Sequence, residues 1–191
     1  MRIGIFEGRK AYYNRLILKI LIEKEPLKAW DIAKQIAKGS MEKTQDVYST
    51  LIRKDGRLNE LLEKEYISVL PNKQFIPTLK GIIAYLLTEK NPKISTLHSN
   101  LLSEMDISDK SDLTLPFFDI PITALSKEFF ECLEEMTVEE LCEFKPLIHE
   151  TLSWIDLDAI SNEELAIILI IRLNKALLKK LLDMLSKLGK F

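Results

Sequence analysis

Residues 26–86 read PLKAWDIAKQIAKGSMEKTQDVYSTLIRKDGRLNELLEKEYISVLPNKQFIPTLKGIIAYL, and this stretch decides the fold. Apolar side chains recur at three- and four-residue steps over 29–37 and 44–64, which predicts two helices. Residues 67–76 are β-prone around the turn Pro-Asn-Lys and predict a short hairpin. Residues 79–88 are apolar again at helical spacing. The stretch therefore predicts two helices, a hairpin and a closing helix, in that order.

Flanking residues support these boundaries. Residues 11–23 have the apolar spacing of an amphipathic helix, which Pro26 would prevent from continuing. Gly39 suits the left-handed residue that often ends a helix, and Thr44 is a favourable N-cap for the next one. A tight turn between two short helices is the signature of a helix-turn-helix.

The helix expected to begin at Thr44 would direct its apolar residues to the core and leave a polar outer side. That side carries Gln45, Tyr48, Ser49 and Arg53, with Ile52 at its margin. Glutamine pairs with adenine edges and arginine with guanine, while tyrosine or serine suits a phosphate or a thymine methyl group. Two lysines, Lys73 at the hairpin tip and Lys80 near the start of the closing helix, are placed to meet the phosphate backbone.

Four motifs in this order carry a resemblance to a known family. They are Ile-Ala-Lys-Gln-Ile-Ala (32–37), Asp-Val-Tyr-Ser-Thr-Leu (46–51), Leu-Glu-Lys-Glu-Tyr-Ile (62–67) and Phe-Ile-Pro-Thr-Leu-Lys-Gly (75–81). Over residues 11–90 the chain resembles winged helix-turn-helix transcription regulators of bacteria and archaea, of the phenolic-acid-decarboxylase-repressor and multiple-antibiotic-resistance types (PadR/MarR-like).

The resemblance implies a third helix in the major groove and a hairpin wing on the adjacent backbone or minor groove, usually in a two-fold homodimer. Carried over by position, it places Thr44, Gln45, Tyr48, Ser49 and Arg53 on DNA, and Asn72, Lys73 and Gln74 at the wing. The full predicted DNA-binding set is Lys43, Thr44, Gln45, Tyr48, Ser49, Arg53, Lys54, Arg57, Asn72, Lys73, Gln74 and Lys80.

The chain departs from the family pattern within the third helix, where it has about seven additional residues. This insertion includes Arg53-Lys54-Asp55-Gly56-Arg57. Seven residues are close to two helical turns, so a continuous helix would keep its apolar stripe in phase. A break at the turn dipeptide Asp55-Gly56 is the alternative and would project a basic loop. We favour a long or kinked helix.

The charge is divided along the chain. Residues 1–92 hold 17 Lys and Arg against 11 Asp and Glu, a net of +6, while residues 93–191 hold 10 against 18, a net of −8. A basic half suits an anionic partner, and an acidic half does not. The expected domains are a winged helix-turn-helix over 1–92, a connecting segment over 93–120, and an all-helical dimerisation or sensing domain over 121–191.

The helical domain has two capping boxes, Thr137-Val-Glu-Glu140 and Ser161-Asn-Glu-Glu164, which predict helix starts. The second would open a helix running to Leu188 with a broad apolar stripe. That stripe suits either the middle helix of a monomeric bundle or a subunit interface. Members of the resembled family are usually dimers, which favours a homodimer. The predicted dimer-interface residues are Ile167, Ile170, Ile171, Leu177, Leu178, Leu181 and Leu185.

Several classes of function find no support in the sequence. There is no glycine-rich phosphate loop and no recognised catalytic set, so an enzyme is not expected. Two cysteines and two histidines are too few and too scattered for a zinc site, and no metal or cofactor is predicted. Cys132 and Cys142 suit idle thiols, with a redox pair as the alternative. No apolar run suits a membrane span or a signal peptide, so a cytoplasmic protein is expected.

The leading hypothesis is a DNA-binding transcription regulator that acts on double-stranded DNA. The alternative is a winged-helix module that binds a protein partner within a larger complex, through its acidic helical half, without binding DNA specifically.

Overall fold

The computed structural model describes residues 4–8, 11–24, 26–94 and 136–172, the last range without 163, 166, 167, 170 and 171. Within them the chain is mainly helical with a small antiparallel hairpin, which confirms that part of the prediction. In chain order the elements are η1 (Gly4–Phe6), α1 (Ala11–Glu23), α2 (Ala29–Ile36), α3 (Met41–Ile52), α4 (Arg57–Glu63), β1 (Ile67–Val69), β2 (Phe75–Pro77), α5 (Leu79–Thr88) and α8 (Val138–Thr151).

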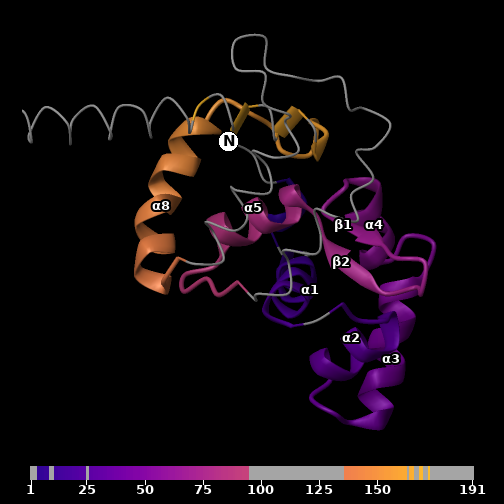
Figure 1. Cartoon of the computed structure of the whole chain (residues 1–191). Helices are drawn as coiled ribbons and strands as arrows, with labels where there is room; N and C mark the ends of the chain where they lie inside the picture. Colours follow the sequence, from indigo (N-terminus) through magenta and orange to yellow (C-terminus); the bar gives the residue numbers. More distant parts are fainter. Residues whose placement is uncertain are drawn as a thin grey trace, which may run out of the picture.

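The hydrophobic core is built around α1 and α5. Every residue of α5 from Leu79 to Leu86 is buried, as expected of a helix with neighbours on all sides. On α1 the buried positions include Ile17, Leu18 and Leu21, which recur at helical spacing. Figure 1 shows α8 on one side of this pair and α3, α4 and the hairpin on the other. α2, α4 and α8 therefore contact this pair, and α3 packs on α2 and α4.

The hairpin is tied to the segment between α1 and α2. β1 and β2 pair in antiparallel register, with Ser68 opposite Ile76. Leu27 and Phe75 form an additional antiparallel bridge, in which the Phe75 N–H donates to the Leu27 carbonyl at 2.8 Å. No pattern in the sequence predicted this bridge. It anchors the hairpin to the connection that leads into α2.

The preferred prediction of one long or kinked third helix is wrong. α3 ends at Ile52 and α4 begins at Arg57. The break follows from Gly56, whose backbone lies so close to the Leu51 carbonyl oxygen that a Cβ atom would overlap it. The Asn59 side-chain amide then donates to the carbonyl of Arg53 at 2.9 Å, which satisfies an acceptor at the end of α3. The alternative, a break at Asp55-Gly56, is the one observed.

The third helix also begins earlier than predicted. Ser40 is the N-cap of α3, with φ −69° and ψ 118°. Thr44 lies within the helix, where its hydroxyl donates to the Ser40 carbonyl at 2.6 Å. The predicted left-handed conformation of Gly39 is confirmed by its φ of 82°, and Lys38 shares it with a φ of 52°. Two consecutive left-handed residues turn the chain sharply, so α3 can begin immediately.

Both predicted capping boxes are confirmed. At the first, the Thr137 N–H donates to the Glu140 carboxylate at 2.8 Å and the Glu140 N–H donates to the Thr137 hydroxyl at 3.2 Å. At the second, Ser161 and Glu164 exchange the same two bonds at 2.8 and 3.2 Å. Pro146 lies inside α8 without ending it. The predicted last helix beyond residue 172 lies outside the described residues, as do all seven predicted dimer-interface residues.

The chain after α8 packs onto the N-terminal region. The Tyr66 hydroxyl donates to the Asp158 carboxylate at 2.6 Å. The Asn162 amide donates to the Glu65 carbonyl at 2.9 Å, and Leu157 belongs to the same hydrophobic cluster as α1 and α5. The described part of the predicted C-terminal domain thus shares a core with the predicted N-terminal domain. Of the predicted connecting segment 93–120, the structure describes residues 93 and 94.

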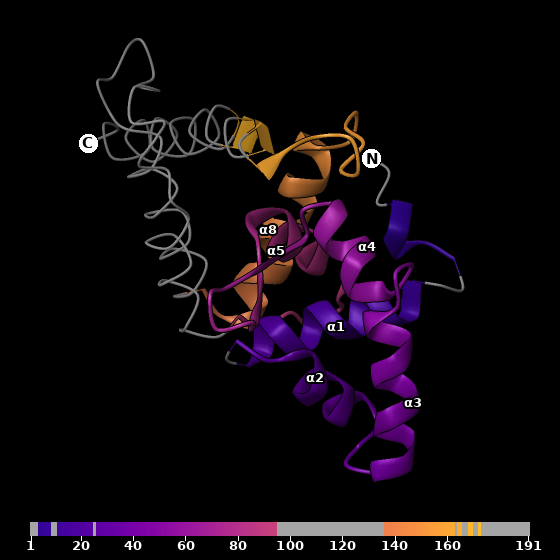
Figure 2. The same ribbon diagram turned by 90° about the vertical axis from the view of Figure 1, so that its right-hand side faces the viewer.

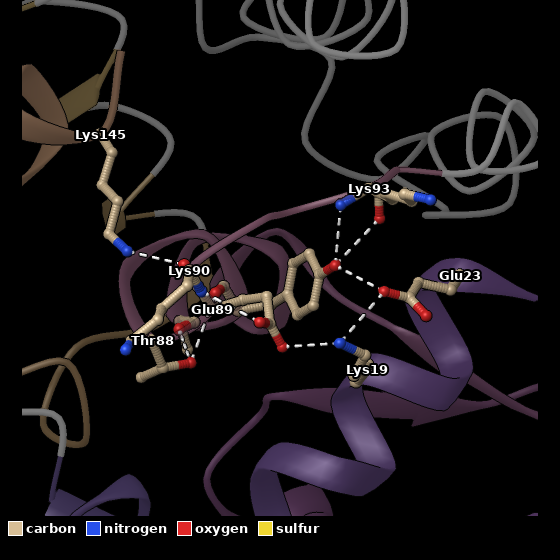
Figure 3. Close-up of polar contacts among 9 residues, drawn as sticks. Lys19, Glu23, Thr88, Glu89, Lys90, Lys93 and Lys145 are labelled. Atoms are coloured by element: carbon tan, nitrogen blue, oxygen red, sulfur yellow. Dashed lines mark hydrogen bonds and ion pairs between the residues drawn. The ribbon is translucent and has the colours of Figure 1, made fainter. Parts of the chain in front are cut away.

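A polar cluster fixes the residues that leave α5 (Figure 3). The Lys19 ammonium lies 2.9 Å from the Glu89 carboxylate and 3.6 Å from that of Glu23. The Tyr85 hydroxyl donates to Glu23 at 3.0 Å and accepts the Lys93 N–H at 2.8 Å. The cluster therefore ties the chain after α5 to α1.

Glu89 is expected to make stability depend on pH. Its burial opposes ionisation, but hydrogen bonds from Lys19 and from backbone N–H groups outweigh burial and lower the pKa of Glu89. A carboxylate whose folded-state pKa is lowered stabilises the fold above its unfolded pKa, and this contribution is lost as pH falls through the folded value. We therefore expect Glu89→Gln to melt below wild type at pH 7, and the difference to shrink below about pH 4.

Thermal melts between pH 3 and pH 7 check this expectation. Glu63→Gln, which alters an exposed carboxylate on α4, is the matched control and should melt like wild type throughout. A Glu89→Gln deficit of the same size at pH 3 and pH 7 would contradict the role of the ionised carboxylate.

Candidate nucleic-acid interface

Four of the predicted contact residues line the accessible side of α3. Lys43 and Gln45 are exposed, and Tyr48 and Ser49 are half-buried. The opposite side of the helix is directed to the core through Leu51, which is completely buried. The prediction that α3 turns a polar side outward is therefore confirmed for these residues.

An aromatic pair joins α2 to α3. The Trp30 and Tyr48 rings meet edge to face, with centroids 5.3 Å apart and an angle of 69° between the planes. Such pairs contribute about 0.5–1.5 kcal/mol beyond the area that they bury. Trp30 therefore restricts the Tyr48 side chain on the surface of α3. No pattern in the sequence predicted this contact.

The structure corrects the predicted set at Thr44 and Lys80, whose side chains are only 1% exposed. Thr44 lies three residues before Val47 and seven before Leu51, so it falls on the core side of α3. The Lys80 ammonium donates to the Ile160 carbonyl at 2.8 Å, and burial lowers the pKa of Lys80. The segment after α8 thus covers the start of α5. The prediction that these two side chains contact DNA is wrong.

The connection between α3 and α4 presents two of its three predicted cations freely. Arg53 and Lys54 are exposed. Arg57 instead pairs with Glu60 on its own helix, with 2.6 Å between the guanidinium and the carboxylate, and is half-buried. Neutralisation by Glu60 makes Arg57 a weak candidate for a phosphate contact.

At the hairpin tip Lys73 is the exposed cation that can reach a phosphate. The Asn72 amide donates to the Gln74 side-chain carbonyl at 2.6 Å, and the Asn72 side chain accepts the Gln74 N–H at 3.0 Å. The Asn72 side chain and the Gln74 side-chain oxygen are therefore engaged in the turn. Lys73 is exposed and has a left-handed φ of 63°. Among the described residues no carboxylate pairs with it.

Two exposed apolar residues of α3 lie outside the predicted contact set: Met41, which no pattern singled out, and Ile52, which was predicted at the margin of the outer side. Met41 is 71% exposed and Ile52 46% exposed, at the two ends of α3. The signal that would have found Met41 was Ser40, a favourable N-cap that directly follows the left-handed Gly39. The later start at Thr44 left Met41 outside the predicted helix.

The described residues hold no group of histidine, cysteine, aspartate and glutamate side chains suited to a metal ion. In the same part of the chain, no helix has the length and apolar character needed to cross a membrane. Comparisons with protein-family models, with curated proteins and with solved structures found no match to this chain.

Proposed function

We propose that the chain is a DNA-binding transcription regulator whose N-terminal region is a winged helix-turn-helix. The observation that carries the proposal is the arrangement of α2 and α3 across a sharp turn, with the polar side of α3 exposed and two free cations, Arg53 and Lys54, at its end. A helix held in this way can enter the major groove, which is wide enough to admit it.

The hairpin occupies the position of the wing in the proposed fold. It follows α4 directly and is tied back to the start of α2 by the bridge between Leu27 and Phe75. Its tip carries the exposed Lys73, which suits a phosphate beside the groove. An anchored hairpin with a cation at its tip can set the register of α3 along the duplex.

In the proposed complex each exposed side chain has a role that follows from its chemistry. The Gln45 amide can pair with both the N6 and N7 positions of adenine. Arg53 suits guanine or phosphate, while Lys43, Lys54 and Lys73 suit phosphates. Ser49 donates its hydroxyl hydrogen to the Gln45 carbonyl at 2.9 Å, so its oxygen remains available as an acceptor.

The charge on these surfaces predicts modest, salt-dependent affinity. α3 itself carries Glu42, Lys43 and Asp46, a net of −1, so phosphate binding depends on cations beyond the helix. The exposed cations of the proposed interface are Lys43, Arg53, Lys54 and Lys73. Four phosphate contacts correspond to a slope of log K against log salt of about −3.6 per chain.

The proposal is tested by titrating the chain with random and genomic duplex fragments at low and moderate salt. We expect binding that weakens with the predicted slope. Arg53→Ala and Lys73→Ala should each lose about tenfold in affinity, the usual loss for one removed contact. Lys73→Gly is a useful second variant, because glycine suits the left-handed backbone at this position and should leave the hairpin intact.

Lys90→Ala is the matched control, because it removes an exposed cation from the chain beyond α5, outside the proposed interface. It should change the affinity less than about twofold, the small loss that remains for a charge remote from the duplex. Unchanged binding in both the Arg53 and Lys73 variants would contradict the assigned interface. No binding at low salt would contradict the proposed function itself.

The proposed regulator acts as a homodimer, because a two-fold pair would place two copies of α3 on successive half-sites of one duplex. Light scattering of the purified chain tests the pairing. A mass that stays at 22.1 kDa over a wide concentration range, also with bound DNA, would contradict it.

A second candidate function is a winged-helix module that binds a protein partner. It is favoured by the net charge of −1 on α3, which gives that helix no attraction of its own for phosphates. The titration above separates the two candidates, since a protein-binding module would ignore duplex DNA at low salt and would be isolated together with its partner.

A further inference from the structure

Three apolar side chains lie along one side of α3 and reach solvent. Met41 and Ile52 are 71% and 46% exposed, and Tyr48 is half-buried between them. Because an α-helix has 3.6 residues per turn, positions 41, 48 and 52 point within about 40° of one another. Gln45 lies at the edge of this stripe. Single exposed apolar residues are ordinary on protein surfaces. An aligned set of them on the helix proposed to enter the major groove suggests that the stripe contacts an apolar group of the ligand.

The surroundings of the stripe favour DNA as the molecule that covers it. Arg53 and Lys54 are exposed and directly follow Ile52, so two cations adjoin one end of the apolar stripe. The stripe is about 16 Å long at 1.5 Å per residue. Base pairs are stacked about 3.4 Å apart, so this length matches about five of them.

The apolar feature of the major groove is the thymine methyl group. We infer that Met41, Tyr48 and Ile52 read thymine methyl groups, and that the preferred duplex presents thymines within about five base pairs of one another. This inference rests on the proposed DNA-binding function. It adds a preference for A·T-rich duplexes, because Gln45, at the edge of the stripe, suits the adenine of the same A·T pairs.

Trp30 holds the central side chain of the stripe in place. Its ring holds the Tyr48 ring edge to face at 5.3 Å, so the central member of the stripe is supported from α2. Met41 and Ile52 are less constrained, since each exposes more of its surface. The stripe thus has a supported centre and adaptable ends.

The test removes the methyl groups while keeping every hydrogen-bonding group of the bases. A random 30-base-pair duplex pool is enriched for binding to the full chain and is then amplified with either thymidine or deoxyuridine triphosphate. Burial of one methyl group corresponds to about a fourfold change in affinity. We expect the uracil pool to bind about fourfold more weakly for each contacted methyl group.

Variants assign the effect to α3. Met41→Gln combined with Ile52→Gln keeps helix-forming side chains at both exposed positions and removes two of the apolar contacts. In this variant we expect the ratio between thymine and uracil pools to fall toward one. Trp154→Gln is the control, because Trp154 is also apolar and 66% exposed. Its segment follows α8 and lies at the opposite end of the molecule from α3 (Figures 1 and 2), so the ratio should be kept.

Each contrary result has its own meaning. Equal binding of the two pools would overturn the thymine reading and leave the proposed function standing. An unchanged ratio between thymine and uracil pools in the double variant would overturn the assignment of the methyl contacts to α3. No enrichment of any duplex at low salt would overturn both proposals and favour a protein partner for the stripe.

Discussion

Tyr66→Ala is expected to lower the free energy of unfolding by about 4 kcal/mol, the typical cost of removing a large buried aromatic side chain. Tyr66 is completely buried. Its ring meets Phe6 edge to face, with centroids 4.8 Å apart, and carries the Lys80 ammonium 4.9 Å from its centroid. Removing the ring would leave a cavity among three segments that are distant in sequence.

The Tyr66 hydroxyl adds a second contribution that can be measured separately. It donates to the Asp158 carboxylate at 2.6 Å, a hydrogen bond to a charged group. Tyr66→Phe keeps the ring and removes this bond, with an expected loss of about 2 kcal/mol. Asp158→Asn keeps an oxygen that can accept the bond and should cost less than Tyr66→Phe.

Urea unfolding followed by circular dichroism measures these differences. The alanine variant should also melt about 8–16 °C below wild type, given the usual shift for a chain of this size. A loss below about 1 kcal/mol in Tyr66→Ala would contradict the shared core, because such small losses are typical of surface substitutions.

Gly81→Ala is expected to destabilise the chain by about 2–3 kcal/mol, although alanine normally stabilises a helix by about 1 kcal/mol relative to glycine. Gly81 lies in α5, where a Cβ atom would overlap the Tyr66 carbonyl oxygen and come within 3.3 Å of the Leu18 side chain. The first neighbour is backbone and cannot rotate away. α5 would have to move off the end of α4 and β1, although eight of its residues are buried.

Gly39→Ala is the matched control for this substitution. Gly39 has a φ of 82° and no atom within 4 Å of its Cβ position, so its variant should lose about 1 kcal/mol from backbone strain alone. Melting curves of the two variants separate steric overlap from backbone conformation. An increase in stability for Gly81→Ala would contradict the close approach of α5 to Tyr66.

Local patterns in the sequence determined most of the secondary structure. The predicted helices over 11–23 and 79–88 coincide with α1 and α5. Both capping boxes formed, because their hydrogen bonds join residues only three positions apart. Apolar periodicity correctly separated the buried Leu51 from the exposed Gln45. These features depend on neighbours along the chain, so the sequence contains them directly.

Tertiary structure decided which predicted site residues can reach a ligand. The position of Lys80 near the start of its helix predicted a surface cation. Its ammonium instead donates to the Ile160 carbonyl, eighty residues later in the chain. Arg57, by contrast, is neutralised locally, by Glu60 three residues later on the same helix. Whether a lysine faces water or a carbonyl depends on contacts between distant segments, and no local spacing records them. The sequence determined the helices and the hairpin, and long-range packing determined the face that they offer.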